Sequence, residues 1–237
     1  MKHTALSIIF ICLISGQAHS AFKYPQIAET GKNIQQFVPE GWKIHRPLDG
    51  KDIVYGDLNK DGIKDVALVL QHTNKVIEAK LCNENYEPPA DYPRILVILL
   101  GRKDGSYRLS TRNNKLLFRS NEGGILGDPL ENLKIERGTL VTEYYGGSAW
   151  RWRITQRFRL ENTGWHLIGY TRHDHWTGDP DSSLTEDYNL ITGKIEVTKK
   201  SGKAKTKKYV VKRKKQQIKL SKTRCWNYKA VDELKVN

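Results

Sequence analysis

Apolar and polar residues alternate along residues 139–171, with turn-forming residues at 137–138, 146–148 and 162–164. This pattern predicts three antiparallel strands of a meander, with one face on the core and the other in solvent. The middle strand shows it best, because its apolar and basic side chains point in opposite directions. The apolar set is Trp150, Trp152, Ile154, Phe158 and Leu160, and the polar set is Arg151, Arg153, Thr155, Arg157 and Arg159. We interpret the arginines as a solvated face paired with carboxylates such as Glu143, or as an anion-binding face.

Further β signals precede this meander. Ile53–Tyr55 and Val66–Leu70 are short β-branched stretches, and Arg94–Arg102 is apolar throughout its interior, as in a buried central strand. A turn at 103–105 leads into Tyr107–Thr111, and a glycine-rich loop covers 120–129. Ile27–Phe37 is predicted to form one short amphipathic helix. The expected fold is mainly β, with antiparallel meander sheets arranged as a sandwich, a barrel or a partial propeller.

The first 20 residues have the three parts of a secretory signal. Lys2 and His3 precede an apolar run, and Ala18 to Ser20 supply small residues for cleavage before Ala21. We therefore expect a periplasmic or secreted protein with no transmembrane anchor after cleavage. Two cysteines, Cys82 and Cys225, then remain, and an oxidising compartment favours a disulfide between them. The alternative is two unpaired thiols.

The net charge of +14 comes from 40 basic and 26 acidic residues, and all of the excess lies at one end. Residues 194–229 hold 15 basic residues and one acid, Glu196, whereas charges elsewhere cancel. We therefore divide the mature chain into a β domain, 21–193, and a basic hairpin or tail, 194–237. Such a block is typical of polyanion binding, most sharply at Lys212, Arg213, Lys214 and Lys215. In an exported protein an anionic envelope component or an acidic protein is the expected partner, not nucleic acid. Alternatively, the lysines protect a sheet edge.

A ligand-rich loop at residues 57–65 is the sharpest chemical motif. Asp57, Asn59, Asp61 and Asp65 occupy positions 1, 3, 5 and 9, and the carbonyl of Ile63 lies at position 7. Calcium takes six to eight oxygen ligands, and alternate residues of a tight loop can supply them. Gly62 allows the sharp turn. Position 12 is Leu68 instead of the bidentate acid of an EF-hand, so an EF-hand is excluded.

This run, from Asp57 to Val69, resembles the calcium loop of FG-GAP repeats of the integrin-alpha type. The resemblance implies a calcium loop joining two strands of a propeller blade. Because the sequence holds one copy and a propeller needs at least four blades, we expect a single hairpin of this kind. The stretch Gly146–Trp152 and the layout of a signal followed by β strands are also similar to uncharacterised secreted bacterial proteins, which implies no activity.

One further stretch is rich in metal-ligating residue types. His173 and His175 would share a strand face as a zinc or copper pair, but the ordinary interpretation is a polar loop. The other members are Asp174, Asp179, Asp181, Glu186 and Asp187. The chain has no G-x-S-x-G or H-E-x-x-H motif. We expect an exported calcium-binding protein with a non-enzymatic role at the cell envelope. The alternative is a hydrolase of an envelope polymer, with paired carboxylates among residues 143–187.

Overall fold

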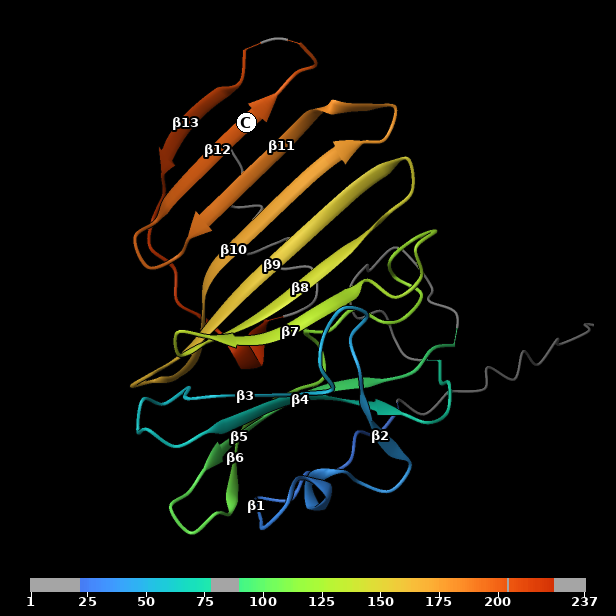
Figure 1. Cartoon of the computed structure of the whole chain (residues 1–237), viewed down its shortest axis with the longest axis vertical. Helices are drawn as coiled ribbons and strands as arrows, with labels where there is room; N and C mark the ends of the chain where they lie inside the picture. The colour runs from blue at the N-terminus through green and yellow to red at the C-terminus, as the bar shows by residue number, and fades with distance from the viewer. Residues whose placement is uncertain (1–21, 78–89, 204, 224–237) are drawn as a thin grey trace, which may run out of the picture.

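The computed structural model describes residues 22–77, 90–203 and 205–223, which form two antiparallel sheets. The six-stranded first sheet has the order β1-β6-β5-β4-β2, and β3 also pairs with β4. In Figure 1 this sheet is seen edge-on, below the larger second sheet. Its strands are β1 (Thr30–Gly31), β2 (Trp42–His45), β3 (Ile53–Gly56), β4 (Asp65–His72), β5 (Arg94–Gly101) and β6 (Tyr107–Asn113).

The second sheet is a curled meander whose strands follow chain order from β7 to β13. The short strand β14 pairs with β10 near its start, where β11 no longer does. The strands are β7 (Leu130–Glu136), β8 (Thr139–Gly147), β9 (Trp150–Glu161), β10 (Gly164–Trp176), β11 (Asp179–Asn189), β12 (Lys194–Lys200), β13 (Lys207–Lys212) and β14 (Ile218–Lys219). The predicted mainly β, antiparallel fold is therefore confirmed.

The first sheet is buried on both faces, which explains why β4 and β5 are apolar at nearly every position. Ala67, Val69, Leu96 and Ile98 face the core shared with the second sheet. The alternate residues of both strands pack against the N-terminal segment that contains Ile27, Phe37 and Trp42. The prediction of a buried central strand at 94–102 is confirmed, because every residue of β5 is buried.

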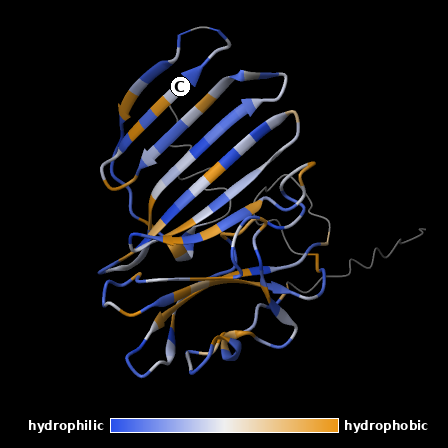
Figure 2. Ribbon diagram, in the orientation of Figure 1, coloured by the Kyte–Doolittle hydropathy of each residue, from blue (hydrophilic) through white to orange (hydrophobic). Residues whose placement is uncertain are grey.

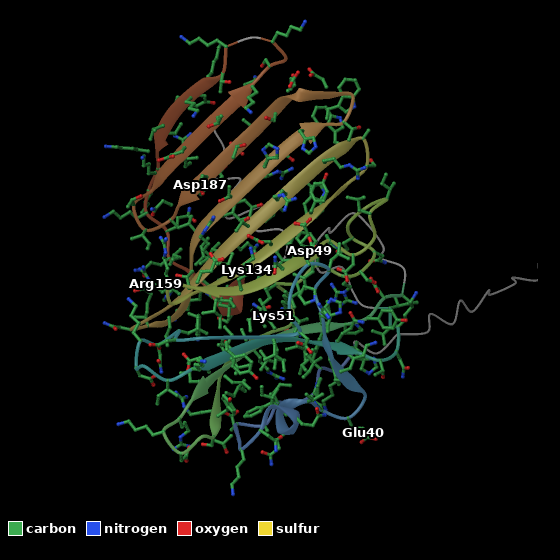
Figure 3. The ribbon with its side chains drawn as sticks, viewed as in Figure 1. Glu40, Asp49, Lys51, Lys134, Arg159 and Asp187 are labelled. Atoms are coloured by element: carbon green, nitrogen blue, oxygen red, sulfur yellow. The ribbon has the colours of Figure 1, made fainter. Side chains whose placement is uncertain are left out.

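The second sheet has one core face and one polar face. Bands of hydrophobic and hydrophilic residues alternate along β9 and β12 in Figure 2. Ile154 and Phe158 of β9 are buried in the shared core, whereas Trp150 at the strand end is 67% exposed. Lys134, Arg159 and Asp187, labelled in Figure 3, belong to the polar face by their register. The predicted alternation is therefore confirmed, except at Trp150.

Two local predictions were wrong. The predicted helix at 27–37 is only the 3-10 turn η1 (Ile34–Phe37), which Asn33 and Gln36 close with a capping box. A second 3-10 turn, η2 (Leu220–Lys222), precedes the end of the described chain. The residues after 173 are not a polar loop, because β10 continues to Trp176 and β11 starts at Asp179.

Among the described residues, no helix has the length and apolar character needed to span a bilayer.

Candidate functional site

The loop between β3 and β4 closes on itself through its aspartate and asparagine side chains. The two carboxylate oxygens of Asp57 accept hydrogen bonds from the backbone N–H groups of Asp61, at 3.1 Å, and Gly62, at 3.0 Å. Asp61 in turn accepts from the N–H of Ile63 and from the side-chain amide of Asn59, both at 2.8 Å. Gly62 has φ of +82°, a conformation that glycine adopts without strain. The structure thus brings the predicted residues into one tight turn.

Asp65 anchors this loop to the first sheet. Its side chain is fully buried at the start of β4. One carboxylate oxygen accepts from the N–H groups of Leu58, at 2.7 Å, and Asn59, at 3.2 Å, and the other accepts from Gly101 in β5, at 2.9 Å. Burial raises the pKa of Asp65, and the three N–H donors oppose this rise. The carboxylate therefore replaces backbone partners that this tight turn lacks.

Gly101 is needed for this arrangement and was not singled out from the sequence. A Cβ at this position would lie 2.4 Å from the carbonyl oxygen of Lys64, which is closer than atoms in proteins approach. Its lack of a side chain lets the loop lie against the end of β5. The sequence signal was a glycine ending an apolar strand, which alone also fits an ordinary turn.

The donor chemistry of the loop suits calcium, but its aspartates do not form a metal cluster. Within the described residues, no three histidine, cysteine, aspartate or glutamate side chains converge closely enough to hold a metal ion. The carboxylates of Asp57 and Asp61 accept N–H groups instead, although each of their oxygens has a second lone pair. Calcium binding by Asp57, Asn59, Asp61, Ile63 and Asp65 stays a prediction.

The histidine pair lies on the polar face of β10. The rings of His173 and His175 have centroids 5.4 Å apart, and the Nδ1 of His173 lies 2.8 Å from the hydroxyl oxygen of Thr185. Burial, followed by the neighbouring His175, lowers the pKa of His173. The expectation that both histidines share a face if the strand continues is confirmed. No third ligand joins them in the part of the chain that is described.

Several charges on the polar face are paired across strands or along one strand. Arg153 pairs with Glu131, and Arg159 bridges to Glu161 at 2.6 Å. Glu143, expected beside the arginines, instead lies 2.8 Å from the ammonium of Lys134. Arg157 donates to the hydroxyl of Thr171 at 2.8 Å. These four contacts lie toward the β7 side and the base of the sheet, and they support the solvated-face interpretation there.

The charge balance differs at the other edge, which we call the basic edge and define as residues 194–222. It holds thirteen lysines and arginines and one acid, Glu196, and all of these basic side chains are exposed. The hairpin of β12 and β13 places Lys194 directly opposite Lys212, and Lys199 opposite Lys207. The ammonium of Lys194 donates a hydrogen bond of 2.5 Å to the carboxylate of Glu196, and this contact lowers the pKa of Glu196. The predicted hairpin is confirmed, and it extends the large sheet through β11.

The four consecutive basic residues lie where the strand ends. Lys212 is the last residue of β13, and Arg213, Lys214 and Lys215 follow outside regular structure. The N–H of Arg213 donates to the carbonyl of Gly193 at 2.8 Å. Because the segment leaves strand geometry, alternation does not divide these side chains between two faces.

A pocket of about 330 Å³ lies beside this segment, at the base of β9, β10 and β11. Glu161 is the one carboxylate among the described residues that line it, and it is bridged to Arg159. His166 and Lys215 also line the pocket. Glycoside hydrolysis needs two carboxyl groups at the bond that is cleaved, so this pocket does not supply them.

A buried ionic cluster between the two sheets was missed in the sequence. The guanidinium of Arg94, 2% exposed, donates to Asp128 and to the side-chain oxygen of Gln71. Burial favours a higher pKa for Asp128, but the hydrogen bonds from Arg94 lower it below its ordinary value. His45 lies 3.6 Å from Asp128, and burial together with Arg94 lowers the pKa of His45 to about 4. The available signal was a single arginine at the start of an apolar strand, which needs a buried partner.

Two predictions fall on residues outside the described ranges: the signal segment 1–20 and the disulfide between Cys82 and Cys225. Comparison of the chain with family models, with curated proteins and with solved structures found no match.

Proposed function

We propose that this chain is an exported, non-enzymatic β-protein that binds an anionic component of the cell envelope through its basic edge. The observation that carries the proposal is the exposure of all thirteen basic side chains of residues 194–222, a segment that contains a single acid, Glu196. Export, which the leader sequence predicts, is the premise that makes an envelope component the relevant polyanion.

The pairing within the hairpin supports a bound polyanion. Like charges directly opposite each other destabilise an antiparallel pair by a few tenths of a kcal/mol to about 1 kcal/mol. The hairpin has two such pairs, Lys194 with Lys212 and Lys199 with Lys207. Protection of an exposed edge needs only isolated charges, so these repulsive pairs, one on each face of the hairpin, favour an edge that an anionic partner neutralises.

The test is binding of the protein to inorganic polyphosphate at increasing salt concentration. Affinity should fall steeply with salt, because exposed charges are screened over about 8 to 10 Å. A variant with Lys212, Arg213, Lys214 and Lys215 changed to glutamine should bind at least tenfold more weakly at an unchanged melting temperature. The matched control changes four exposed basic residues of the first sheet and its flanks, Lys32, Lys51, Arg102 and Lys103, to glutamine. Equal binding by both variants, with aggregation of the first alone, would mean that the lysines only protect the edge.

A second candidate function is calcium binding by the β3–β4 loop. The favouring observation is the closure of the loop around Asp57, whose carboxylate fixes the N–H groups of Asp61 and Gly62. A resident calcium ion would cross-link the oxygen donors of this turn. Saturation at a hundredfold excess over the dissociation constant should stabilise the fold by about 2.7 kcal/mol. Thermal melts with calcium and with a chelator measure this, and identical midpoints, or an unchanged response in Asp61→Ala, would exclude it.

A further inference from the structure

Four large apolar side chains are exposed at one end of the large sheet. Trp150 and Trp176 are 67% and 44% exposed, and they form a directly opposed cross-strand pair with ring centroids 6.5 Å apart. Ile125 and Leu126, in the loop before β7, are 73% and 42% exposed. Clustered exposed apolar groups of this size mark an interaction surface more often than single ones do.

Hydrogen bonds hold these residues at the same end. The N–H of Gly147, in the turn before Trp150, donates to the carbonyl of Gly123 at 2.9 Å, which brings the loop with Ile125 to this turn. The N–H of Thr177 donates to the carbonyl of Ala149 at 2.8 Å and ties the next turn to it. The four residues therefore form one surface, which we call the apolar tip (Ile125, Leu126, Trp150 and Trp176).

The basic edge continues directly from the apolar tip. The N–H of Gly202, in the β12–β13 turn, donates to the hydroxyl of Ser182 at 2.8 Å, and Ser182 donates to Asp179 at 2.6 Å. The turns β8–β9, β10–β11 and β12–β13 thus lie at the same end of the large sheet, from the top to the upper right of Figure 1. Asp179 and Asp181 are acids at the start of β11, beside these turns, and Asp179 accepts the hydrogen bond from Ser182. The basic residues near this end are Arg151, Lys199, Lys200, Lys203, Lys205, Lys207 and Lys208.

We propose that the apolar tip and the adjoining lysines form a docking surface for an anionic lipid bilayer. This inference rests on the proposed function and names the lipid headgroup as its anion. Tryptophan prefers the headgroup region, where its ring is partly buried and its N–H remains hydrated. Lysines near an anionic leaflet are attracted to it, with roughly a fivefold gain in affinity for each charge. A soluble polyanion would be bound by the lysines alone and would leave the apolar tip without a role.

Charge complementarity and geometry point to the same occupant. Ile125 and Leu126 lie in a loop, whereas Trp150 begins β9 and Trp176 ends β10 on the face opposite the arginines. A flat surface can therefore meet these side chains at the strand ends, away from the long polar face of the sheet. The lysines of the β12–β13 turn lie along the same edge and would meet the headgroups of the same leaflet. Shallow insertion of the apolar tip and electrostatic attraction are the two signals that stable peripheral attachment needs.

The test measures co-flotation of the protein with vesicles of phosphatidylglycerol and phosphatidylcholine, against phosphatidylcholine alone and against inorganic polyphosphate in solution. Ile125→Ser/Leu126→Ser should weaken binding to the anionic vesicles at least tenfold and leave polyphosphate binding unchanged. The matched control is Leu48→Ser/Ile77→Ser, which changes two side chains of the first sheet and its flanks that are 72% and 64% exposed. A triple change of Lys199, Lys203 and Lys205 to glutamine should weaken both kinds of binding, by roughly fivefold per lysine for the vesicles.

Tryptophan fluorescence supplies a readout of insertion. Bound vesicles containing brominated lipid should quench the emission of Trp150 and Trp176, and Trp150→Phe/Trp176→Phe, which keeps aromatic packing, should lose most of that quenching. Two outcomes would overturn the bilayer inference and leave the proposed function intact. The first is a protein that binds polyphosphate but whose tryptophan emission is not quenched by the brominated vesicles. The second is equal binding to anionic vesicles by the Ile125→Ser/Leu126→Ser variant and the Leu48→Ser/Ile77→Ser control. Absence of binding to either anion would overturn both.

Discussion

Asp65→Ala offers a direct test of how the loop is attached to the first sheet. The substitution removes the acceptor of three backbone N–H groups, those of Leu58, Asn59 and Gly101. A buried donor left without a partner costs about 1 to 3 kcal/mol. The donors of Leu58 and Gly101 are buried, whereas that of Asn59 is part-buried and can turn to water. The substitution also removes the cost of burying a charged carboxylate, the cost that raises the pKa of Asp65, and this gain offsets part of the loss.

The expected net loss is therefore about 3 kcal/mol, a large share of the 5 to 15 kcal/mol by which domains are stable. For a chain of this size the melting temperature should fall by about 6 to 12 °C. Urea denaturation with an unchanged slope measures the loss directly. Asp61→Ala is the matched control, because its carboxylate bonds are exposed, and it should cost less than about 1 kcal/mol in the absence of calcium. Equal midpoints for Asp65→Ala and Asp61→Ala would refute the anchoring argument.

Two further predictions concern the buried cluster between the sheets. The folded-state pKa of His45, about 4, lies below its unfolded value of about 6.5. The contribution of neutral His45 to the free energy of unfolding should therefore be fully present above pH 6.5 and be lost as the pH falls toward 4. The loss is on the order of 2 to 3 kcal/mol, and His45→Gln should remove this part of the pH dependence of urea midpoints. Asp128→Ala should cost about 3 to 5 kcal/mol at neutral pH because it strands the buried Arg94, and Arg94→Met in the same background should recover part of that loss. A loss of less than about 1 kcal/mol on Asp128→Ala would mean that the ion pair between Arg94 and Asp128 does not stabilise the fold.

The parts of the fold that could be predicted are those with a local signal. The meander from 139 to 171 alternates in hydrophobicity, and β4 and β5 are short apolar runs, so each pattern indicated its own strand. Strand β11 (Asp179–Asn189) has no such pattern, because it is mostly polar and is held by pairing with β10 and β12 on both sides. The helix predicted at 27–37 is wrong because a local pattern was present but misleading. The spaced apolar residues of this segment pack onto the first sheet from an extended chain with one 3-10 turn.

The candidate site shows the same division. The ligand spacing of residues 57–65 predicted a tight loop that joins two strands, which the structure confirms, whereas the hydrogen bonds that close the loop were not predicted. The partners of Asp65 and Arg94 could not be predicted, because Gly101 and Asp128 lie 36 and 34 residues away in the sequence. Residues so far apart meet only when the sheets form. The charge block at 194–229 was plain in composition, but the place of its described part, residues 194–222, at the edge of the large sheet depends on the β11–β12 pairing.

Hydrogen–deuterium exchange with and without inorganic polyphosphate tests the central claim most directly, because it locates the bound surface on the protein. The account predicts slower exchange within residues 194–215 on binding, unchanged exchange in β4 and β5, and loss of this protection at high salt. Unchanged exchange across residues 194–215 at saturating polyphosphate, or protection confined to the first sheet, would contradict it.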